Sequence, residues 1–169
     1  GFNTESRKDT KNGLFCGLEG PTFKGIQLSK QAIAAGAADA IVECEVKEAG
    51  NSIIYVDDVL KTWQDLAHHH RKQFILAGDT QIPFIAITGS NGKTTSKELI
   101  RAVLSTVYKT YTTEGNLNNH IGIPLTLLKI KQDAEIAVIE MGANHQKEID
   151  GYCTYTMPTH GIITNFDKA

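Results

Sequence analysis

The stretch ITGSNGKTTSKELI, residues 87–100, decides how the second half of this chain is interpreted. In the common ATP-binding loop, G-x-x-x-x-G-K-[ST], the first glycine stands five residues before the glycine of the Gly-Lys pair. Here that position holds Ile87, and the first glycine, Gly89, comes only three residues before the pair. An apolar segment, residues 84–88, precedes the loop, and a helical pattern, residues 93–107, follows it. This order of strand, loop and helix is the context that a phosphate-binding loop requires.

The residues of this loop supply the groups that bind phosphate. Phosphate binding needs exposed backbone N–H groups, a positive charge and the N-terminus of a helix. Lys93 can reach a β- or γ-phosphate as a point charge, and the Thr94 hydroxyl is placed to hold Mg²⁺. The alternative is an ordinary glycine turn in which Thr94 caps a helix. The context favours nucleotide binding through Gly89, Ser90, Asn91, Gly92, Lys93, Thr94 and Thr95.

A second acidic ligand is expected at the end of a neighbouring strand. Glu140 closes the apolar run of residues 134–139 and stands two residues before Gly142. An acid at that point can face the crevice at the carboxyl end of a parallel sheet, where α/β proteins bind ligands. The alternative is an exposed carboxylate at the end of a strand.

An asparagine-rich segment, TEGNLNNHIGIPLTLL, occupies residues 113–128. Asn116, Asn118 and Asn119 lie between two glycines there. Amide side chains in such a loop can donate hydrogen bonds to phosphate or carboxylate oxygens without adding charge. A turn-rich structural loop explains the same composition, so both interpretations stay open on the residues alone.

Strand and helix patterns alternate along the chain and predict an α/β protein with a mainly parallel sheet. In the second half, the predicted strands are residues 84–88, 109–113, 134–141 and 160–166. In the first half, strands are predicted at residues 13–18, 39–46 and 51–58, and helices at 26–36 and 58–74. The segment LAGDTQIP, residues 76–83, has the composition of a linker. We therefore predict two domains, residues 1–79 and 80–169.

Composition narrows the class of protein further. A net charge of -2 argues against a general nucleic-acid or anionic-membrane binder, because both need a positive field. No apolar run approaches the roughly 20 residues of a membrane-spanning helix. Three widely spaced cysteines predict neither a disulfide framework nor a zinc site, so we expect a reducing compartment, the cytoplasm.

Three motifs together resemble the Mur ligases. They are ITGSNGKTTSKELI, the asparagine-rich segment and VIEMGANHQKEI, residues 138–149. The short-spaced phosphate loop is the normal form in that family. The asparagine-rich segment is similar to the corresponding segment in one branch of the family, whose members join D-alanyl-D-alanine to UDP-N-acetylmuramoyl-tripeptide. The N-terminal stretch TESRKDTKNGLFCGLEGPTFKG, residues 4–25, also resembles the family's first domain.

The resemblance implies a cytoplasmic step of peptidoglycan synthesis that uses ATP and Mg²⁺. ATP phosphorylates the terminal carboxylate of the muramoyl-tripeptide, and the amine of D-alanyl-D-alanine attacks the acyl phosphate. Residues 1–79 would be the UDP-muramoyl-substrate domain and residues 80–169 part of the central ATP-binding domain. We expect a monomer. The implied site residues are Lys93 and Glu140 in catalysis, Thr94 and Glu140 on magnesium, and Ser6, Arg7, Asn118 and Asn119 on the substrate.

The chain also departs from the family pattern. Glu5 replaces the usual Asp before the Ser-Arg pair, and Asp167 stands where a glycine is expected. The resemblance covers well under half of such an enzyme, so we expect these residues alone to be inactive as a ligase. The alternative functions are a P-loop NTPase and a nucleotide- or UDP-sugar-binding module.

Overall fold

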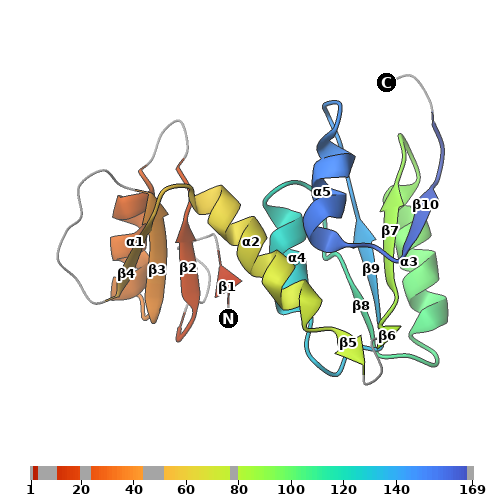
Figure 1. The fold of residues 1–169 in the computed structure, drawn as a ribbon, viewed down its shortest axis with the longest axis horizontal. Helices are drawn as coiled ribbons and strands as arrows, with labels where there is room; N and C mark the ends of the chain where they lie inside the picture. The colour runs from red at the N-terminus through yellow and green to blue at the C-terminus, as the bar shows by residue number, and fades with distance from the viewer. Residues whose placement is uncertain (1, 4–10, 20–23, 44–51, 77–79, 167–169) are drawn as a thin grey trace. The chain divides into compact units, whose positions relative to one another are not determined.

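The computed structural model describes five segments of the chain, residues 2–3, 11–19, 24–43, 52–76 and 80–166 (Figure 1). Ser6 and Arg7, the residues predicted to hold the UDP end of the substrate, lie outside these segments. By its contacts the chain divides into two compact units, residues 1–65 and 66–169. Among the described helices, none combines the length and the apolar character needed to cross a bilayer.

The first unit contains a parallel sheet packed against a helix. The sheet has the order β1-β2-β3-β4, with strands β1 (Phe2–Asn3), β2 (Leu14–Gly17), β3 (Asp39–Glu43) and β4 (Ile53–Val56). Helix α1 (Gly25–Ala34) packs against β2 and β3. The helix starts so close to β2 that a Cβ on Gly25 would lie 2.0 Å from the Gly17 carbonyl oxygen. A core of Phe15, Ala32, Ala37 and Ala40 fills the space between helix and sheet.

Helix α2 (Val59–Lys72) begins as the sequence predicts. The Oδ1 of Asp58 accepts a hydrogen bond from the Lys61 backbone N–H at 2.7 Å, which caps the first turn. The contacts divide the chain inside this helix, earlier than the boundary predicted after residue 79. The reason is that the last turns of α2 pack into the second unit.

The segment predicted as a plain linker, residues 76–83, contains paired backbone. Strands β5 (Ile75–Leu76) and β6 (Thr80–Gln81) form an antiparallel pair. This backbone pairing was not predicted, because glycine, polar residues and proline are typical of any connecting segment.

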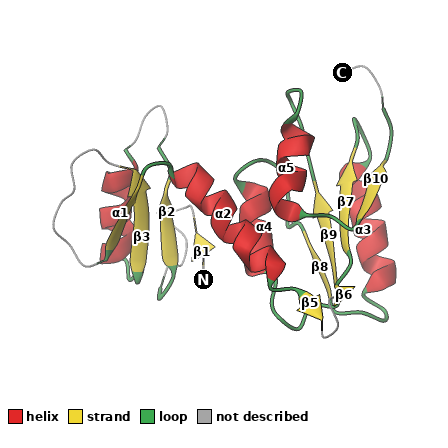
Figure 2. Ribbon diagram, in the orientation of Figure 1, coloured by secondary structure: helices red, strands yellow, loops and turns green. Residues whose placement is uncertain are grey.

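The second unit is built on a four-stranded parallel sheet of order β10-β7-β9-β8 (Figure 2). Its strands are β7 (Phe84–Thr88), β8 (Thr110–Thr112), β9 (Ile136–Glu140) and β10 (His160–Ile163). Every residue of β9 is buried, as expected for a central strand. The prediction of an α/β protein with parallel sheets is confirmed.

Helices cover both faces of this sheet. Helix α3 (Lys93–Leu104) packs against β7, β8 and β9. Helices α4 (Gly122–Lys129) and α5 (Glu148–Thr156) lie on the opposite side (Figure 1). Right-handed crossover connections explain this arrangement. The β7-to-β8 connection runs across the sheet in one direction, and the β8-to-β9 and β9-to-β10 connections run in the other, so their helices lie on opposite faces.

The sequence missed both α4 and α5. Helix α4 lies in the segment interpreted as a loop, and its residues 122–128 are all buried. Its Gly122 and Pro124 read as turn signals, but proline is tolerated in the first turn of a helix. Helix α5 carries Gly151 and shows no clear amphipathic pattern, so no local signal marked it as a helix.

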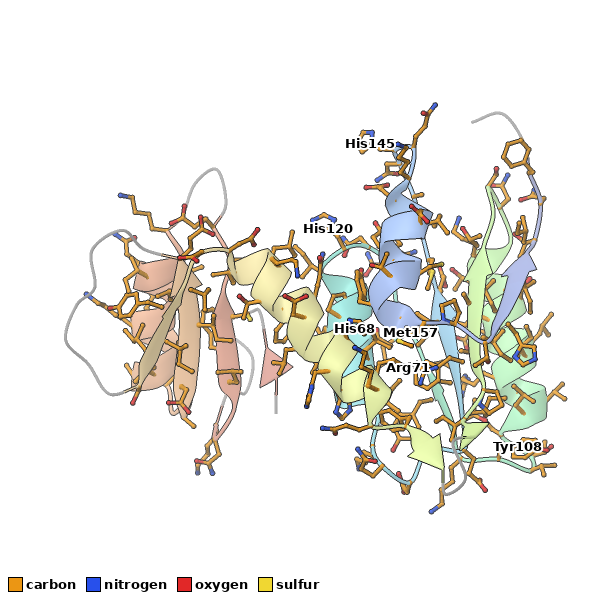
Figure 3. All side chains as sticks on the ribbon, in the orientation of Figure 1. His68, Arg71, Tyr108, His120, His145 and Met157 are labelled. Atoms are coloured by element: carbon orange, nitrogen blue, oxygen red, sulfur yellow. The ribbon has the colours of Figure 1, made fainter. Side chains whose placement is uncertain are left out.

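Arg71 ties the end of α2 to the end of α5. Its side chain is buried, its Nε donates to the Thr156 carbonyl at 2.9 Å, and its Nη2 donates to the Met157 carbonyl at 2.9 Å. The guanidinium also lies 3.7 Å from the centre of the Phe84 ring. Figure 3 shows Arg71 and His68 beside Met157, whose sulfur is 3.3 Å from the His68 Nε2. Burial lowers the pKa of Arg71 to about 10, so the group stays charged at neutral pH.

Replacing Arg71 by alanine is expected to lower the free energy of unfolding by roughly 3 kcal/mol. One buried and one partly buried carbonyl group lose their donors, and each unmade hydrogen bond costs about 1–3 kcal/mol. Urea unfolding of the purified chain measures the change. The matched control is Arg101→Ala, whose partly exposed pair with Glu98 should be worth no more than about 1 kcal/mol. Equal effects of the two substitutions would contradict this account of α5.

Candidate functional site

The loop between β7 and α3 turns on two glycines. Gly89 has a φ of 137° and Gly92, the N-cap of α3, has a φ of 79°. A side chain is strained at either angle. A Cβ on Gly89 would also lie 2.2 Å from the Thr164 Oγ1 and 2.9 Å from the Asn165 carbonyl oxygen. The loop therefore depends on glycine where it passes the segment that follows β10.

Residues 164–165 form hydrogen bonds with the loop, and the sequence did not predict these contacts. The backbone N–H groups of Ser90 and Asn91 donate to the carbonyl and the side-chain oxygen of Asn165, at 3.2 and 2.8 Å. The Thr164 hydroxyl donates to the Asn91 carbonyl at 2.5 Å. These N–H groups were predicted to bind phosphate, and here they are engaged within the protein. Those of Lys93, Thr94 and Thr95 belong to the first turn of α3, where backbone N–H groups have no intrahelical acceptor, so they are the ones left for a phosphate.

Lys93 folds back over the loop. Its Nζ donates to the Gly89 carbonyl at 2.7 Å and to the Ser90 carbonyl at 3.3 Å. The ammonium group is therefore held against the loop by two neutral carbonyl acceptors. A phosphate oxygen arriving there would meet a charge that is already in place.

Glu140 lies directly beside the loop. The register of β7 and β9 pairs Glu140 with Ile87, so the carboxylate emerges at the edge of the sheet where the loop starts. The residue is 1% exposed. Its Oε1 accepts hydrogen bonds from the Thr94 hydroxyl at 3.1 Å and from the Asn118 Nδ2 at 2.9 Å. The structure thus brings together three predicted site residues from three separate elements.

The residues present fit a magnesium ion. Thr94 and Glu140 offer a hydroxyl and a carboxylate oxygen 3.1 Å apart, and Mg²⁺ prefers such oxygen ligands together with water and phosphate. The Oε2 of Glu140 is buried and makes no hydrogen bond among the described residues, but the Lys97 ammonium lies 3.5 Å from it, so Oε1 is the oxygen available to the ion. In the part of the chain that the structure describes, no cluster of three or more His, Cys, Asp or Glu side chains could hold a metal ion. A cation here would therefore need ligands from the nucleotide and from water.

The three predicted asparagines have different surroundings. Asn118 contacts Glu140, and the backbone N–H of Gly142 donates to the Asn118 carbonyl at 2.8 Å. Asn119 instead accepts hydrogen bonds from the N–H groups of Ile121 and Gly122, at 3.1 and 2.8 Å, and so leads into α4. Asn116 is exposed. The structural and the ligand-binding interpretations of this segment therefore both have residues that fit them.

Two cavities meet at Lys93. One, of about 470 Å³, is polar and is lined by Lys93, Asn116, Asn118, Asn119, His120, Gly142, Ala143, Asn144, His145, Glu148 and Tyr152. The other, of about 610 Å³, is lined by Thr88, Gly89, Ser90, Asn91, Lys93, Ala143, Asn144, Ile149, Ile163, Asn165 and Phe166. His120 and His145, labelled in Figure 3, were not predicted as site residues. Both lie inside the motifs of residues 113–128 and 138–149, but neither has a recognisable ligand spacing.

Comparison with known proteins agrees with this geometry. Residues 87–169 match the Mur ligase middle domain. The whole chain is 40% identical to UDP-N-acetylmuramoyl-tripeptide--D-alanyl-D-alanine ligase of Bacillus subtilis and covers 36% of that protein. For the enzyme of the same name in Escherichia coli, the identity is 37% over 98% of this chain and 35% of the relative.

The chain is a homologue of the MurF ligases. Among solved structures, the D-alanyl-D-alanyl ligase of Acinetobacter baumannii superposes on 99% of the chain with a TM-score of 0.88 and 36% identity, over 36% of its own length. MurF of Thermotoga maritima, solved in complex with ADP, gives a TM-score of 0.83 at 27% identity, over 97% of this chain and 37% of that protein. This MurF homologue spans about a third of the length of the relatives it matches.

Gly89→Ala should destabilise this MurF homologue by about 1–3 kcal/mol or more, because overpacking and an unfavourable φ act together. The added methyl group would meet Thr164 and Asn165, which are close on the opposite side of the loop. Urea unfolding measures the loss. Gly151→Ala is the matched control, since a Cβ there meets nothing within 4 Å and alanine favours a helix. If Gly89→Ala lowers the free energy of unfolding no more than Gly151→Ala does, this description of the packing is contradicted.

Glu148 sets a pH dependence at the start of α5. Backbone N–H groups of His145 and Asn144 donate to its Oε2 at 2.9 and 2.6 Å, and they hold the pKa of the carboxyl below its ordinary value of 4.5. A depressed pKa in the folded state means that the carboxylate stabilises the fold above the ordinary pKa. That contribution is lost as the pH falls through the lower folded value.

Glu148→Gln should therefore reduce stability at pH 7, and the difference from the unmodified chain should disappear in acid below the folded pKa of Glu148. Urea unfolding at a series of pH values from 7 downwards tests this. A difference that persists unchanged at the acid end would show that the charge is not what stabilises the start of α5.

Proposed function

We propose that the chain forms the nucleotide-binding part of an ATP-dependent ligase that adds D-alanyl-D-alanine to UDP-N-acetylmuramoyl-tripeptide. The observation that carries the proposal is the cluster of Lys93, Thr94, Glu140 and Asn118 at the phosphate loop. The homology to enzymes that bear this name supports the substrates. The ADP complex of the Thermotoga maritima relative supports the nucleotide.

The site residues suit phosphoryl transfer to a carboxylate. The substrate carboxylate and the migrating phosphoryl group both carry negative charge, so the barrier falls when that charge is neutralised and the two are aligned. Lys93 would neutralise one side from the centre of the loop. Thr94 and Glu140 would hold Mg²⁺, which supplies further positive charge to the phosphate oxygens when bound. The Asn118 amide, whose Nδ2 lies 2.9 Å from the Glu140 Oε1, would keep that carboxylate oriented.

The remaining roles follow from the same proposal. ATP would phosphorylate the terminal carboxylate of the tripeptide, and the amine of D-alanyl-D-alanine would displace phosphate from the acyl phosphate. Residues 1–79 would hold the UDP-muramoyl end, with Ser6 and Arg7 among its contacts.

Arg7→Ala should then weaken binding of the UDP-muramoyl-tripeptide while leaving ADP affinity unchanged, which calorimetric titration of each ligand can test.

Lys93→Met should weaken binding of MgADP to this chain by about 10–100-fold, because a hydrogen bond to a charged group contributes about 1.5–3 kcal/mol. Isothermal titration calorimetry measures the change. Lys129→Met is the matched control, since Lys129 pairs with exposed Glu114 and lines neither cavity of the site. Unchanged MgADP affinity in Lys93→Met would remove the loop from the nucleotide site.

The reaction itself is tested by measuring phosphate release. The assay uses a protein that contains this chain and is as long as its relatives. The ligase proposal predicts release only when both the muramoyl-tripeptide and the dipeptide are present, with formation of the amide product. Phosphate release without either substrate would instead identify an NTPase. Nucleotide binding with no phosphate release under any condition would leave a binding module.

A further inference from the structure

Lys97 is a second lysine of α3, one helical turn beyond Lys93, and its side chain is 1% exposed. Its Nζ donates to the Thr113 carbonyl at 2.8 Å and lies 3.5 Å from the Glu140 Oε2. It also lies 3.3 Å from the Oε1 of Glu98, whose side chain is 47% exposed. Lysine is rarely buried to this extent unless it is paired.

The two oxygens of Glu140 have separate partners. Oε1 accepts hydrogen bonds from the Thr94 hydroxyl and the Asn118 amide. Oε2 has no hydrogen-bond partner among the described residues, and the ammonium group of Lys97 is the cation paired with it. Thr113 joins the same arrangement from β8's end, because its Oγ1 accepts the Glu140 backbone N–H at 2.9 Å. Lys97 therefore contacts both the carboxylate and the segment that fixes its backbone.

We propose that Lys97 is a positioning residue that holds Glu140 with Oε1 directed at Thr94, so that the acid is in place before the magnesium nucleotide arrives. The proposal rests on the proposed function, because it concerns the residues expected to hold Mg²⁺. Taking a carboxylate out of water is costly unless a partner offsets its charge. Lys97 provides that offset at Oε2, the oxygen that Thr94 and Asn118 do not contact. In this proposal Asn118 and Lys97 contact Glu140 but do not bind the cation.

A competing effect has the opposite sign. The positive charge of Lys97 repels a divalent cation at Oε1, so its removal could strengthen rather than weaken magnesium binding. Without Lys97, Oε2 is buried with no charge opposite it, so the carboxylate is expected to move away from Thr94. If it does, the positioning effect dominates. The two effects predict opposite changes in the same measurement, which makes the proposal decidable.

The test is ADP affinity measured by calorimetry with Mg²⁺ and again with EDTA, for the unmodified chain and for Lys97→Met. We expect the substitution to reduce the magnesium-dependent gain in affinity by at least about 10-fold, the size of one contact to a charged group. Affinity in EDTA should change by less than about 2-fold, because Lys93 and the loop are untouched. Lys129→Met again serves as the control.

Lys97→Gln separates positioning from simple anchoring and remains useful if Lys97→Met does not fold. Glutamine keeps an N–H donor for the Thr113 carbonyl but removes the charge that faces Glu140. Loss of the magnesium-dependent gain in Lys97→Gln, with recovery in Lys97→Arg, supports the proposal. A full or increased gain in either uncharged variant overturns it and indicates that Lys97 only anchors α3 or repels the cation.

A double-mutant cycle tests whether Lys97 acts through Glu140. In a Glu140→Gln background, Lys97→Met should change the magnesium-dependent gain by less than about 2-fold, because residues that act as a unit are not additive. Additive losses would overturn the proposal. If the unmodified chain binds no ADP, or binds it without any effect of Mg²⁺, the proposed function itself fails. If it binds MgADP but the Lys97 variants do so equally well, only the role of Lys97 fails.

Discussion

The buried carboxylate of Glu140 is the group on which the arrangement of this site depends. It sits at the end of a fully buried strand, β9, where an uncompensated charge would be strongly unfavourable. Its partners come from different elements: Thr94 and Lys97 from α3, and Asn118 from the segment before α4. One carboxylate therefore connects α3 and the asparagine segment to the end of β9.

The phosphate loop is set by a second group of contacts on its other side. Asn165 and Thr164 bind its backbone, Gly89 allows that close approach, and Lys93 spans its mouth. The loop is thus closed by the protein's own donors and acceptors. A phosphate on the first turn of α3 would meet the Lys93 ammonium already held beside the loop by two carbonyl groups. A charge placed in advance in this way needs no reorganisation, which makes electrostatic stabilisation of a migrating charge effective.

Local sequence patterns predicted the parallel α/β fold, β7, the loop, α3 and the acid at the end of β9, because period, glycine spacing and strand ends are all visible along the chain. The contacts of Lys97 were not predictable, since no local pattern says which lysine of α3 turns inward; only its spacing of four residues from Lys93 places both on one face. Helix α4 was hidden by Gly122 and Pro124, and it forms because tertiary burial outweighs their weak helix propensity. The assignments of site residues to ligands stay predictions.

The central claim is that Thr94 and Glu140 face a magnesium nucleotide whose phosphates lie on the first turn of α3. The most direct measurement is a crystal structure of the chain with ADP and Mn²⁺, with the ion located by anomalous scattering. The account predicts one strong peak within coordination distance of the Thr94 hydroxyl and the Glu140 carboxylate, with phosphate density at the N–H groups of Lys93, Thr94 and Thr95. A nucleotide bound elsewhere, or a metal ion that contacts neither residue, would contradict it.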